Sequence, residues 1–159
     1  MIVIEKLNSN VSEVIDSFIA RFYLSCGNTK AAKDKLIKLV TKYPESYVGH
    51  KLLAQIYEKE GGQRKAADEY VQAIDLNKND YDSYYKVANI LTDLDKKDDA
   101  IKMLNNLLSK KPDYTEATVA LGDLLIEKED YKEAVNIYTE ALKYSPTSFD
   151  LNYNLGIVY

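Results

Sequence analysis

The sequence predicts an all-α protein, a solenoid built from antiparallel helix pairs that repeat every 34 residues. Proline spacing, a gap-free register and apolar columns at helical spacing support this fold class. The chain contains only three prolines. Pro112 and Pro146 are 34 residues apart, and Pro44 and Pro112 are separated by twice that distance. A fixed period of this length is typical of repeat proteins, in which each repeat stacks on its neighbours.

The repeat register begins at Glu13 and contains no insertion or deletion. The four complete blocks are residues 13–46, 47–80, 81–114 and 115–148, and residues 149–159 begin a fifth block. Residues 1–12 do not follow the period, so we expect an N-terminal extension or cap, because the first repeat of a solenoid must cover its outer apolar face. The apolar side chains available for this are Ile2, Val3, Ile4 and Leu7.

The first half of each block predicts an amphipathic helix. Positions 7 and 11 are large and apolar and lie one helical turn apart, while position 8 is small. Position 7 holds Ile19, Leu53, Val87, Leu121 and Leu155; position 8 holds Ala20, Ala54, Ala88, Gly122 and Gly156; position 11 holds Tyr23, Tyr57, Leu91, Leu125 and Tyr159. The final block should therefore form only this first helix.

The second half of each block predicts a second helix. Position 20 is always alanine, where a larger side chain would push two helices apart, and positions 24 and 28 continue the apolar stripe. Short turns precede this helix at Gly27-Asn28-Thr29, Gly61-Gly62-Gln63, Lys96-Lys97-Asp98 and Glu129-Asp130-Tyr131, so each helix pair should be antiparallel. Proline at position 32 ends the helix; in the second block, Lys78 stands there and we expect Asn77 and Asn79 to help.

Alternate blocks differ in how they fill positions 24 and 27. The first and third blocks pair Leu36 with Leu39 and Leu104 with Leu107, whereas the second and fourth pair Tyr70 with Ala73 and Tyr138 with Ala141. A larger ring is matched by a smaller neighbour, as expected if both positions fill one packed space. The substitution Ala73→Leu alone should therefore overpack its block.

The chain resembles the tetratricopeptide repeat family, and the resemblance covers residues from about Glu13 to Tyr159. The fourth block carries that family's leucine-glycine, tyrosine, alanine, aromatic, alanine and proline spacing at Leu121-Gly122, Tyr131, Ala134, Tyr138, Ala141 and Pro146. Position 4, often tryptophan in the family, departs from it and is Asp16, His50, Tyr84, Thr118 and Asn152. The resemblance implies a right-handed superhelix whose first helices line a concave groove.

In this family, positions 2, 5, 9, 12 and 13 of the first helix face the groove. Charge along these blocks changes sign, from a net +2 in the first (six basic, four acidic residues) to −4 in the fourth (three basic, seven acidic). A protein or peptide ligand with basic groups toward the later blocks would gain complementarity. From these positions we select as candidate peptide-binding residues Arg21, Lys51, Gln55, Tyr85, Asn89, Asp123 and Tyr153. The lysine-asparagine pattern by which some members clamp a terminal carboxylate is absent.

The composition argues against catalysis and against binding to nucleic acid. The formal net charge is −4 and the pI is about 5.1, so no positive field attracts phosphate backbones. Cys26 and His50 are the only residues of their types, which leaves no disulfide, multi-cysteine zinc site or histidine-based catalytic site. We expect no enzymatic activity, catalytic residues, metal or cofactor. No signal segment or membrane span is visible, so we expect a cytoplasmic protein with no membrane partner.

The function most consistent with these features is a non-enzymatic scaffold for protein–protein interaction, binding a peptide or helix in the groove. Two alternatives remain: a targeting or regulatory arm of a longer protein with an enzyme domain beyond Tyr159, and a self-assembling structural spacer. Leu151, Leu155, Gly156 and Tyr159 repeat interior packing positions without a second helix to cover them. We therefore expect a fragment cut within its fifth repeat, whose open C-terminal helix could support a homodimer.

Overall fold

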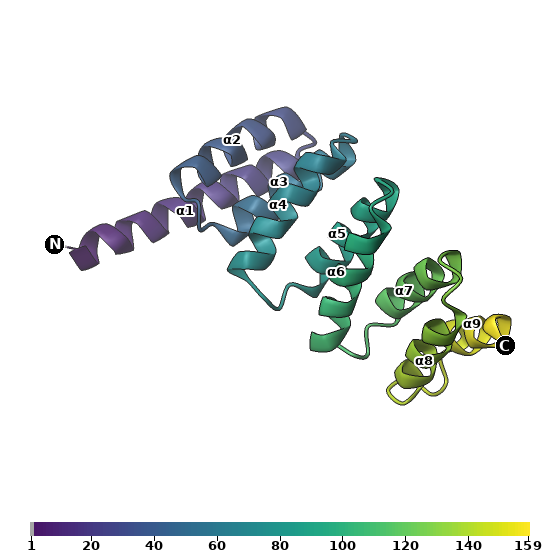
Figure 1. Ribbon diagram of the computed structural model, residues 1–159. Helices are drawn as coiled ribbons and strands as arrows, with labels where there is room; N and C mark the ends of the chain where they lie inside the picture. The colour runs from purple at the N-terminus through teal and green to yellow at the C-terminus, as the bar shows by residue number, and fades with distance from the viewer. Residues whose placement is uncertain (1) are drawn as a thin grey trace. The chain divides into compact units, whose positions relative to one another are not determined.

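The computed structural model describes the backbone of residues 2–159 and the side chains of residues 11–159. Across these residues the chain is all-helical and has no strand (Figure 1). Residues 2–159 contain nine helices, namely α1 (Ile2–Ser25), α2 (Thr29–Lys42), α3 (Tyr47–Lys59), α4 (Gln63–Leu76), α5 (Tyr81–Asp93), α6 (Lys97–Lys110), α7 (Thr115–Glu127), α8 (Tyr131–Leu142) and α9 (Phe149–Val158). The predicted all-α fold of helix pairs is confirmed. Helices α3, α5, α7 and α9 begin at the first residue of a predicted block.

The chain divides into two compact units, Met1–Ser83 and Tyr84–Tyr159. In the first unit, α1 packs against α2, α2 against α3, and α3 against α4. In the second unit, α6 packs against α7, α7 against α8, and α9 against both α7 and α8. Contacts between helices that are close in sequence dominate both units, as expected for a repeat protein.

The turn inside each helix pair contains one residue with left-handed backbone. It falls at the same position in every complete block: Gly27 (φ 75°), Gly61 (φ 75°), Asp95 (φ 57°) and Glu129 (φ 61°). The next residue donates its backbone N–H to a carbonyl in the last turn of the first helix, for example Asn28 to Tyr23 at 2.8 Å and Asp130 to Leu125 at 2.8 Å. This pattern ends the first helix and starts the return of the chain.

The third turn differs slightly from the sequence prediction. Lys97 and Asp98 belong to α6, and the left-handed residue that opens this turn, Asp95, lies just before the predicted segment Lys96-Lys97-Asp98. No glycine marks this turn, which is why its position was misjudged by one residue. In the second block, α4 ends at Leu76 without a proline, and the Asn77 side chain accepts a hydrogen bond from the Asn79 backbone at 3.1 Å.

The positions that are small or apolar in every block of the repeat form the core of each unit. The four position-20 alanines, Ala32, Ala66, Ala100 and Ala134, are completely buried. Tyr70 and Tyr138 are also completely buried, which agrees with the predicted packing of a large ring beside a small neighbour. At the C-terminal helix, Leu151 is buried, Leu155 is half-buried, and Gly156 and Tyr159 are exposed.

Helix α1 begins at Ile2 and runs without interruption through the predicted extension into the first block. The predicted capping role of Ile2, Val3, Ile4 and Leu7 concerns side chains outside the described part of the chain, so it stays a prediction. Within the described residues, no helix combines the length and the hydropathy that a membrane crossing requires.

Candidate functional site

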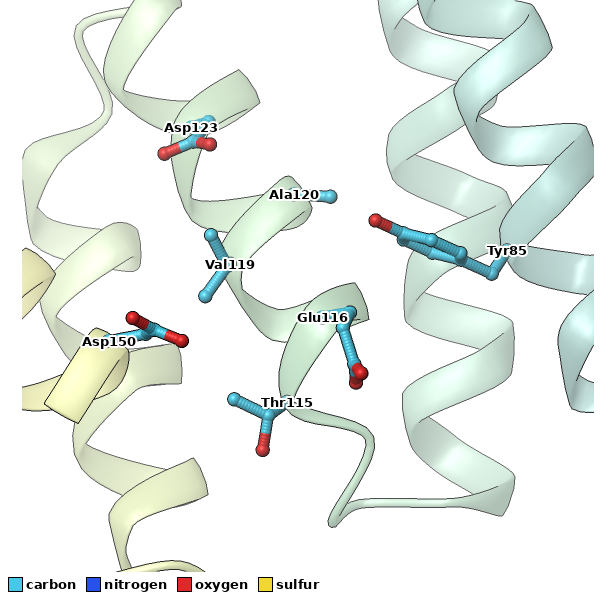
Figure 2. Close-up of a pocket in the computed structure, with 7 residues that line it drawn as sticks. All are labelled: Tyr85, Thr115, Glu116, Val119, Ala120, Asp123 and Asp150. Atoms are coloured by element: carbon cyan, nitrogen blue, oxygen red, sulfur yellow. The ribbon is translucent and has the colours of Figure 1, made fainter. Parts of the chain in front are cut away.

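A pocket of about 300 Å³ opens on the first helices of the second unit. Figure 2 shows the seven side chains that surround it. Helix α5 contributes Tyr85 and α9 contributes Asp150, while the other five come from α7: Thr115, Glu116, Val119, Ala120 and Asp123. Thr115, Val119 and Asp123 follow one another at intervals of four residues, as do Glu116 and Ala120, so all five lie on one side of the helix.

Tyr85 forms one wall of the pocket. Its side chain projects toward Ala120 on α7 (Figure 2). The Tyr85 ring also lies against the Tyr114 ring, with centroids 5.6 Å apart and a tilt of 38°, a separation at which aromatic rings attract each other. This contact positions an aromatic face beside the pocket.

The polar lining of the pocket is acidic. Glu116, Asp123 and Asp150 all reach it, and within the described residues no lysine or arginine lies within ion-pair distance of any of them. Partial loss of hydration raises the pKa of Asp123, and the negative charge of Glu127 raises it further. Three carboxylates without a cation leave a negative potential that a cationic group of a ligand would neutralise. No group suited to hold a metal ion occurs in the described part of the chain.

The structure brings together two of the predicted site residues, Tyr85 and Asp123. The selection from sequence omitted Glu116 and Asp150, although both occupy position 2 of their blocks and face the groove in the family pattern. It favoured tyrosine and asparagine over carboxylates, because an exposed acidic residue is more often simply solvated. The signal that could have identified them is that position 2 is acidic in two consecutive blocks, the fourth and the fifth.

Arg21 lies in a different pocket, of about 250 Å³, in the first unit. Its neighbours there are Val14, Ser17 and Phe18 on α1, together with Val48 on α3. Phe18 and Val14 are largely exposed. This pocket is mainly apolar, in contrast to the acidic pocket of the second unit.

Lys51 forms ion pairs within the first unit, and its part in ligand binding stays a prediction. Its ammonium group contacts Asp80 at 2.7 Å and Asp82 at 3.3 Å. Burial acts to lower the pKa of Lys51, but the hydrogen bond and charge of Asp80 outweigh it and raise the pKa above its usual value. Lys51 thus joins α3 to the chain at the start of α5.

Asp80 is the centre of this network and was not identified from the sequence. Its buried carboxylate accepts hydrogen bonds from Tyr47 at 2.9 Å and from the Ser83 hydroxyl at 2.6 Å, besides Lys51. Burial acts to raise the pKa of Asp80, yet these donors lower it overall. Asp80 lies just before α5 and also accepts from the Ser83 backbone at 3.4 Å, as an N-cap residue does.

The remaining predicted residues do not line these pockets. Gln55 on α3 and Asn89 on α5 are half-buried. Tyr153 on α9 is exposed and stacks on Phe149, with centroids 5.8 Å apart and an interplanar angle of 13°. Their participation in ligand binding stays a prediction.

Family models identify the repeats. A model described as TPR repeat matches residues 122–159, and one described as tetratricopeptide repeat matches residues 91–137. Together these matches cover residues 91–159, and there they confirm the resemblance to the tetratricopeptide repeat family that the residue pattern predicted. No curated protein matches it in sequence.

Solved structures share this fold. MamA protein is 18% identical, with a TM-score of 0.78 over 92% of this chain and 80% of MamA. YrrB, described as a TPR protein with an unusual peptide-binding site, is 19% identical, with a TM-score of 0.73 over 91% of this chain and 74% of YrrB. A tetratricopeptide repeat protein from Parabacteroides merdae is 21% identical, with a TM-score of 0.78 over 95% of this chain and 59% of that protein. At these identities the similarity establishes the fold.

Proposed function

We propose that this chain is a non-enzymatic protein-interaction scaffold whose second unit binds a peptide segment through a lysine or arginine side chain. The observation that supports this most directly is the pocket with three carboxylates and no cation of its own. A basic side chain entering it would form charge-assisted hydrogen bonds with Asp123 and Asp150. Its aliphatic stem would lie along Val119 and the Tyr85 ring, where a cation–π contact adds to the attraction.

The fold favours the same interpretation. Tetratricopeptide repeats commonly present a peptide-binding surface, and one structure with this fold, YrrB, has a peptide-binding site by its description. The acidic pocket agrees with the partner predicted from the charge gradient, in which basic groups lie toward the later blocks. A cytoplasmic location and the absence of enzymatic activity are parts of the proposal, and both rest on composition and on the usual role of such repeats.

Binding to a positional peptide library tests the proposal. Fluorescent peptides of extended sequence, each with one varied position, would be titrated with the wild-type chain and followed by anisotropy. We expect selection of lysine or arginine at one position, and affinity that falls with salt concentration because exposed charges are screened. The variant Asp123→Asn with Asp150→Asn should weaken binding about tenfold or more, as for loss of a charged hydrogen-bonding pair.

The matched control removes the same number of charges elsewhere in the second unit. Asp99 on α6 and Glu133 on α8 are exposed and lie outside the pocket, so the double variant Asp99→Asn with Glu133→Gln should bind like the wild type. If this control and the pocket variant lose affinity equally, the peptide responds to net charge rather than to the pocket. A library without preference for a basic residue would reject the proposal directly.

Self-association through α9 is a second candidate function. The helix exposes Phe149, Tyr153, Ile157 and Tyr159, an apolar set larger than scattered surface residues usually form. Sedimentation velocity would show a concentration-dependent dimer that Tyr153→Ser with Ile157→Ser dissociates. A third possibility, a targeting arm for an enzyme domain in a longer protein, requires the sequence of that protein.

A further inference from the structure

In the second block, the residue at position 4 is His50. Its side chain fills a space between Pro44 and Glu69, which we call the position-4 slot. His50 is 8% exposed. One ring nitrogen, Nδ1, lies 2.6 Å from Glu69 Oε2, and the other, Nε2, lies 2.9 Å from the carbonyl oxygen of Pro44. The imidazole therefore packs in a slot with an acceptor on each side, one of them the carbonyl of the proline that ends the preceding helix pair.

In the fourth block the same slot lacks a ring. The residues that correspond to Pro44, His50 and Glu69 are Pro112, Thr118 and Ile137, each 68 positions later. Thr118 is 1% exposed and its short side chain points back to the Tyr114 carbonyl, 3.4 Å away. A pocket of about 210 Å³ opens in its place, and its lining includes Leu108, Pro112, Thr118, Ile137, Ala141 and Tyr144.

The proline carbonyl at this slot accepts a position-4 side chain elsewhere in the chain. In the fifth block the Asn152 amide donates to the Pro146 carbonyl at 3.2 Å, as His50 approaches Pro44. Within the described residues, no side chain approaches Pro112 in this way. The fourth block thus presents an acceptor and an apolar space where other blocks hold their own side chain.

We infer that this pocket binds the indole ring of a tryptophan from a partner protein. The lining is mostly apolar and includes Pro112, whose carbonyl would accept one hydrogen bond, which matches an indole with its single N–H donor. Ile137 replaces Glu69, so an imidazolium would leave its second N–H without an acceptor. Glu140 at the rim already pairs with Lys143 at 2.5 Å, so the pocket does not require a charged ligand.

This site is independent of the proposed peptide pocket. The acidic pocket is lined by α5, α7 and α9, whereas the tryptophan pocket is lined by residues of α6, α7 and α8 and by Pro112 and Tyr144, which follow α6 and α8. The two sites share no lining residue. Either can therefore fail its test without affecting the other.

The chain contains no tryptophan, so indole fluorescence excited at its red edge reports the ligand alone. N-acetyl-tryptophanamide would be titrated with the wild-type chain, and its emission should shift to the blue and gain anisotropy on binding. Thr118→Tyr supplies a ring from within the chain and should weaken binding about tenfold or more. Tyr144→Ala, at a residue 58% exposed, tests the rim without risk to the core and should weaken binding several-fold.

Matched controls make the result specific. Thr139→Tyr places the same ring on an exposed threonine of α8 outside the pocket and should leave binding unchanged. N-acetyl-leucinamide should compete poorly, because it lacks both the ring and its N–H. If leucinamide competes equally, or if neither Thr118→Tyr nor Tyr144→Ala reduces binding, the inference is wrong. Binding of free indole without binding of the amide would also overturn it, because a side chain attached to a backbone would then not fit.

A reciprocal experiment builds the pocket in the first unit. His50→Thr with Glu69→Ile copies the fourth-block residues into the second block. If this variant retains a cooperative melt, it should bind two equivalents of N-acetyl-tryptophanamide instead of one. A stoichiometry that stays at one in the folded variant would show that the slot itself does not determine binding.

Discussion

The second and fourth blocks bury a tyrosine at the same position but treat its hydroxyl differently. In α4, the Tyr70 hydroxyl donates to Glu58 Oε2 at 2.7 Å. In α8, the Tyr138 hydroxyl has no hydrogen-bond partner in the described residues and lies against Gly122, where an added Cβ would be 2.0 Å from it. Burial raises the pKa of both tyrosines; for Tyr138 it reaches about 12, with the charge of Asp123 contributing.

The same contrast extends to the surface charges of the two units. In the first unit Lys51 is neutralised by Asp80 and Asp82, whereas in the second unit Glu116, Asp123 and Asp150 line a pocket without a cation. The first unit uses its polar groups to stabilise itself. The second leaves hydrogen-bonding capacity unused, which is the property a binding surface requires.

Removing the carboxylate of Asp80 should produce the largest loss of stability. Asp80→Ala breaks the pair with Lys51, removes acceptors for Tyr47 and Ser83, and deletes an N-cap. We expect a decrease of about 2–4 kcal/mol in the free energy of unfolding, less than for a fully buried pair because Lys51 is partly exposed. Urea denaturation measures it. Asp150→Ala in the second unit, which removes a carboxylate without an ion-pair partner, is the comparison and should cost little.

Acid titration sharpens this prediction. The pKa of Asp80 is lower in the folded chain than its ordinary value, so its stabilising contribution is complete above the ordinary carboxyl pKa and is lost as the pH falls through the folded-state pKa. Asp80→Asn should therefore flatten the acid side of the stability profile. An unchanged profile would mean that the network does not couple to folding.

Gly122→Ala should have the next largest effect. The new methyl group would meet the Tyr138 hydroxyl at 2.0 Å, so the ring must move, and overpacking of this kind costs about 1–3 kcal/mol. Gly156→Ala is the matched control, because nothing lies within 4 Å of its added Cβ. That substitution should be neutral or stabilising, since alanine favours a helix.

A second variant separates the clash from other effects of alanine. Gly122→Ala combined with Tyr138→Leu recreates the alanine–leucine pair that the third block has at Ala88 and Leu104, both buried. The double variant should recover part of the lost stability. If it is less stable than either single variant, the contact between the two side chains does not explain the cost.

Removing the two tyrosine hydroxyls should have different effects on stability. Tyr70→Phe loses a hydrogen bond to a carboxylate and leaves Glu58 with one donor fewer, so we expect a loss of about 1–2 kcal/mol. Tyr138→Phe removes a buried hydroxyl that has no partner, so it should be neutral or slightly stabilising. Thermal melts of both variants measure the difference. Equal losses would contradict the distinction between the two blocks.

The sequence predicted the fold because the repeat places apolar and small residues at fixed positions in every block. Ala66, Tyr70 and Gly122 could be assigned to the core from their columns alone. The candidate site was predicted only in part. Lys51 occupies a groove position, but its pairing with Asp80 depends on how the two ends of the second block meet in space. The empty slot at Thr118 also requires the structure, because a short side chain reveals a pocket only when its surroundings do not collapse.

The smallest expected effect concerns the left-handed turn residues. The first unit has glycine at this position, Gly27 and Gly61, whereas the second has Asp95 and Glu129. Left-handed backbone is disfavoured for residues other than glycine, and asparagine or aspartate adopts it at a lower cost than glutamate. Glu129→Gly should raise stability by about 0.5–1 kcal/mol, and Asp95→Gly by less.

The reverse substitutions test the same physical cause in the first unit. Gly27→Ala and Gly61→Ala meet no atom within 4 Å, so any loss comes from backbone conformation alone, and we expect about 1 kcal/mol each. Thermal melts of the four single variants should show both Gly→Ala variants destabilised and both changes to glycine stabilised, Glu129→Gly more than Asp95→Gly. If Glu129→Gly destabilises the chain, the left-handed turn in the fourth block is held by contacts of the Glu129 side chain, and the two units differ in more than their choice of turn residue.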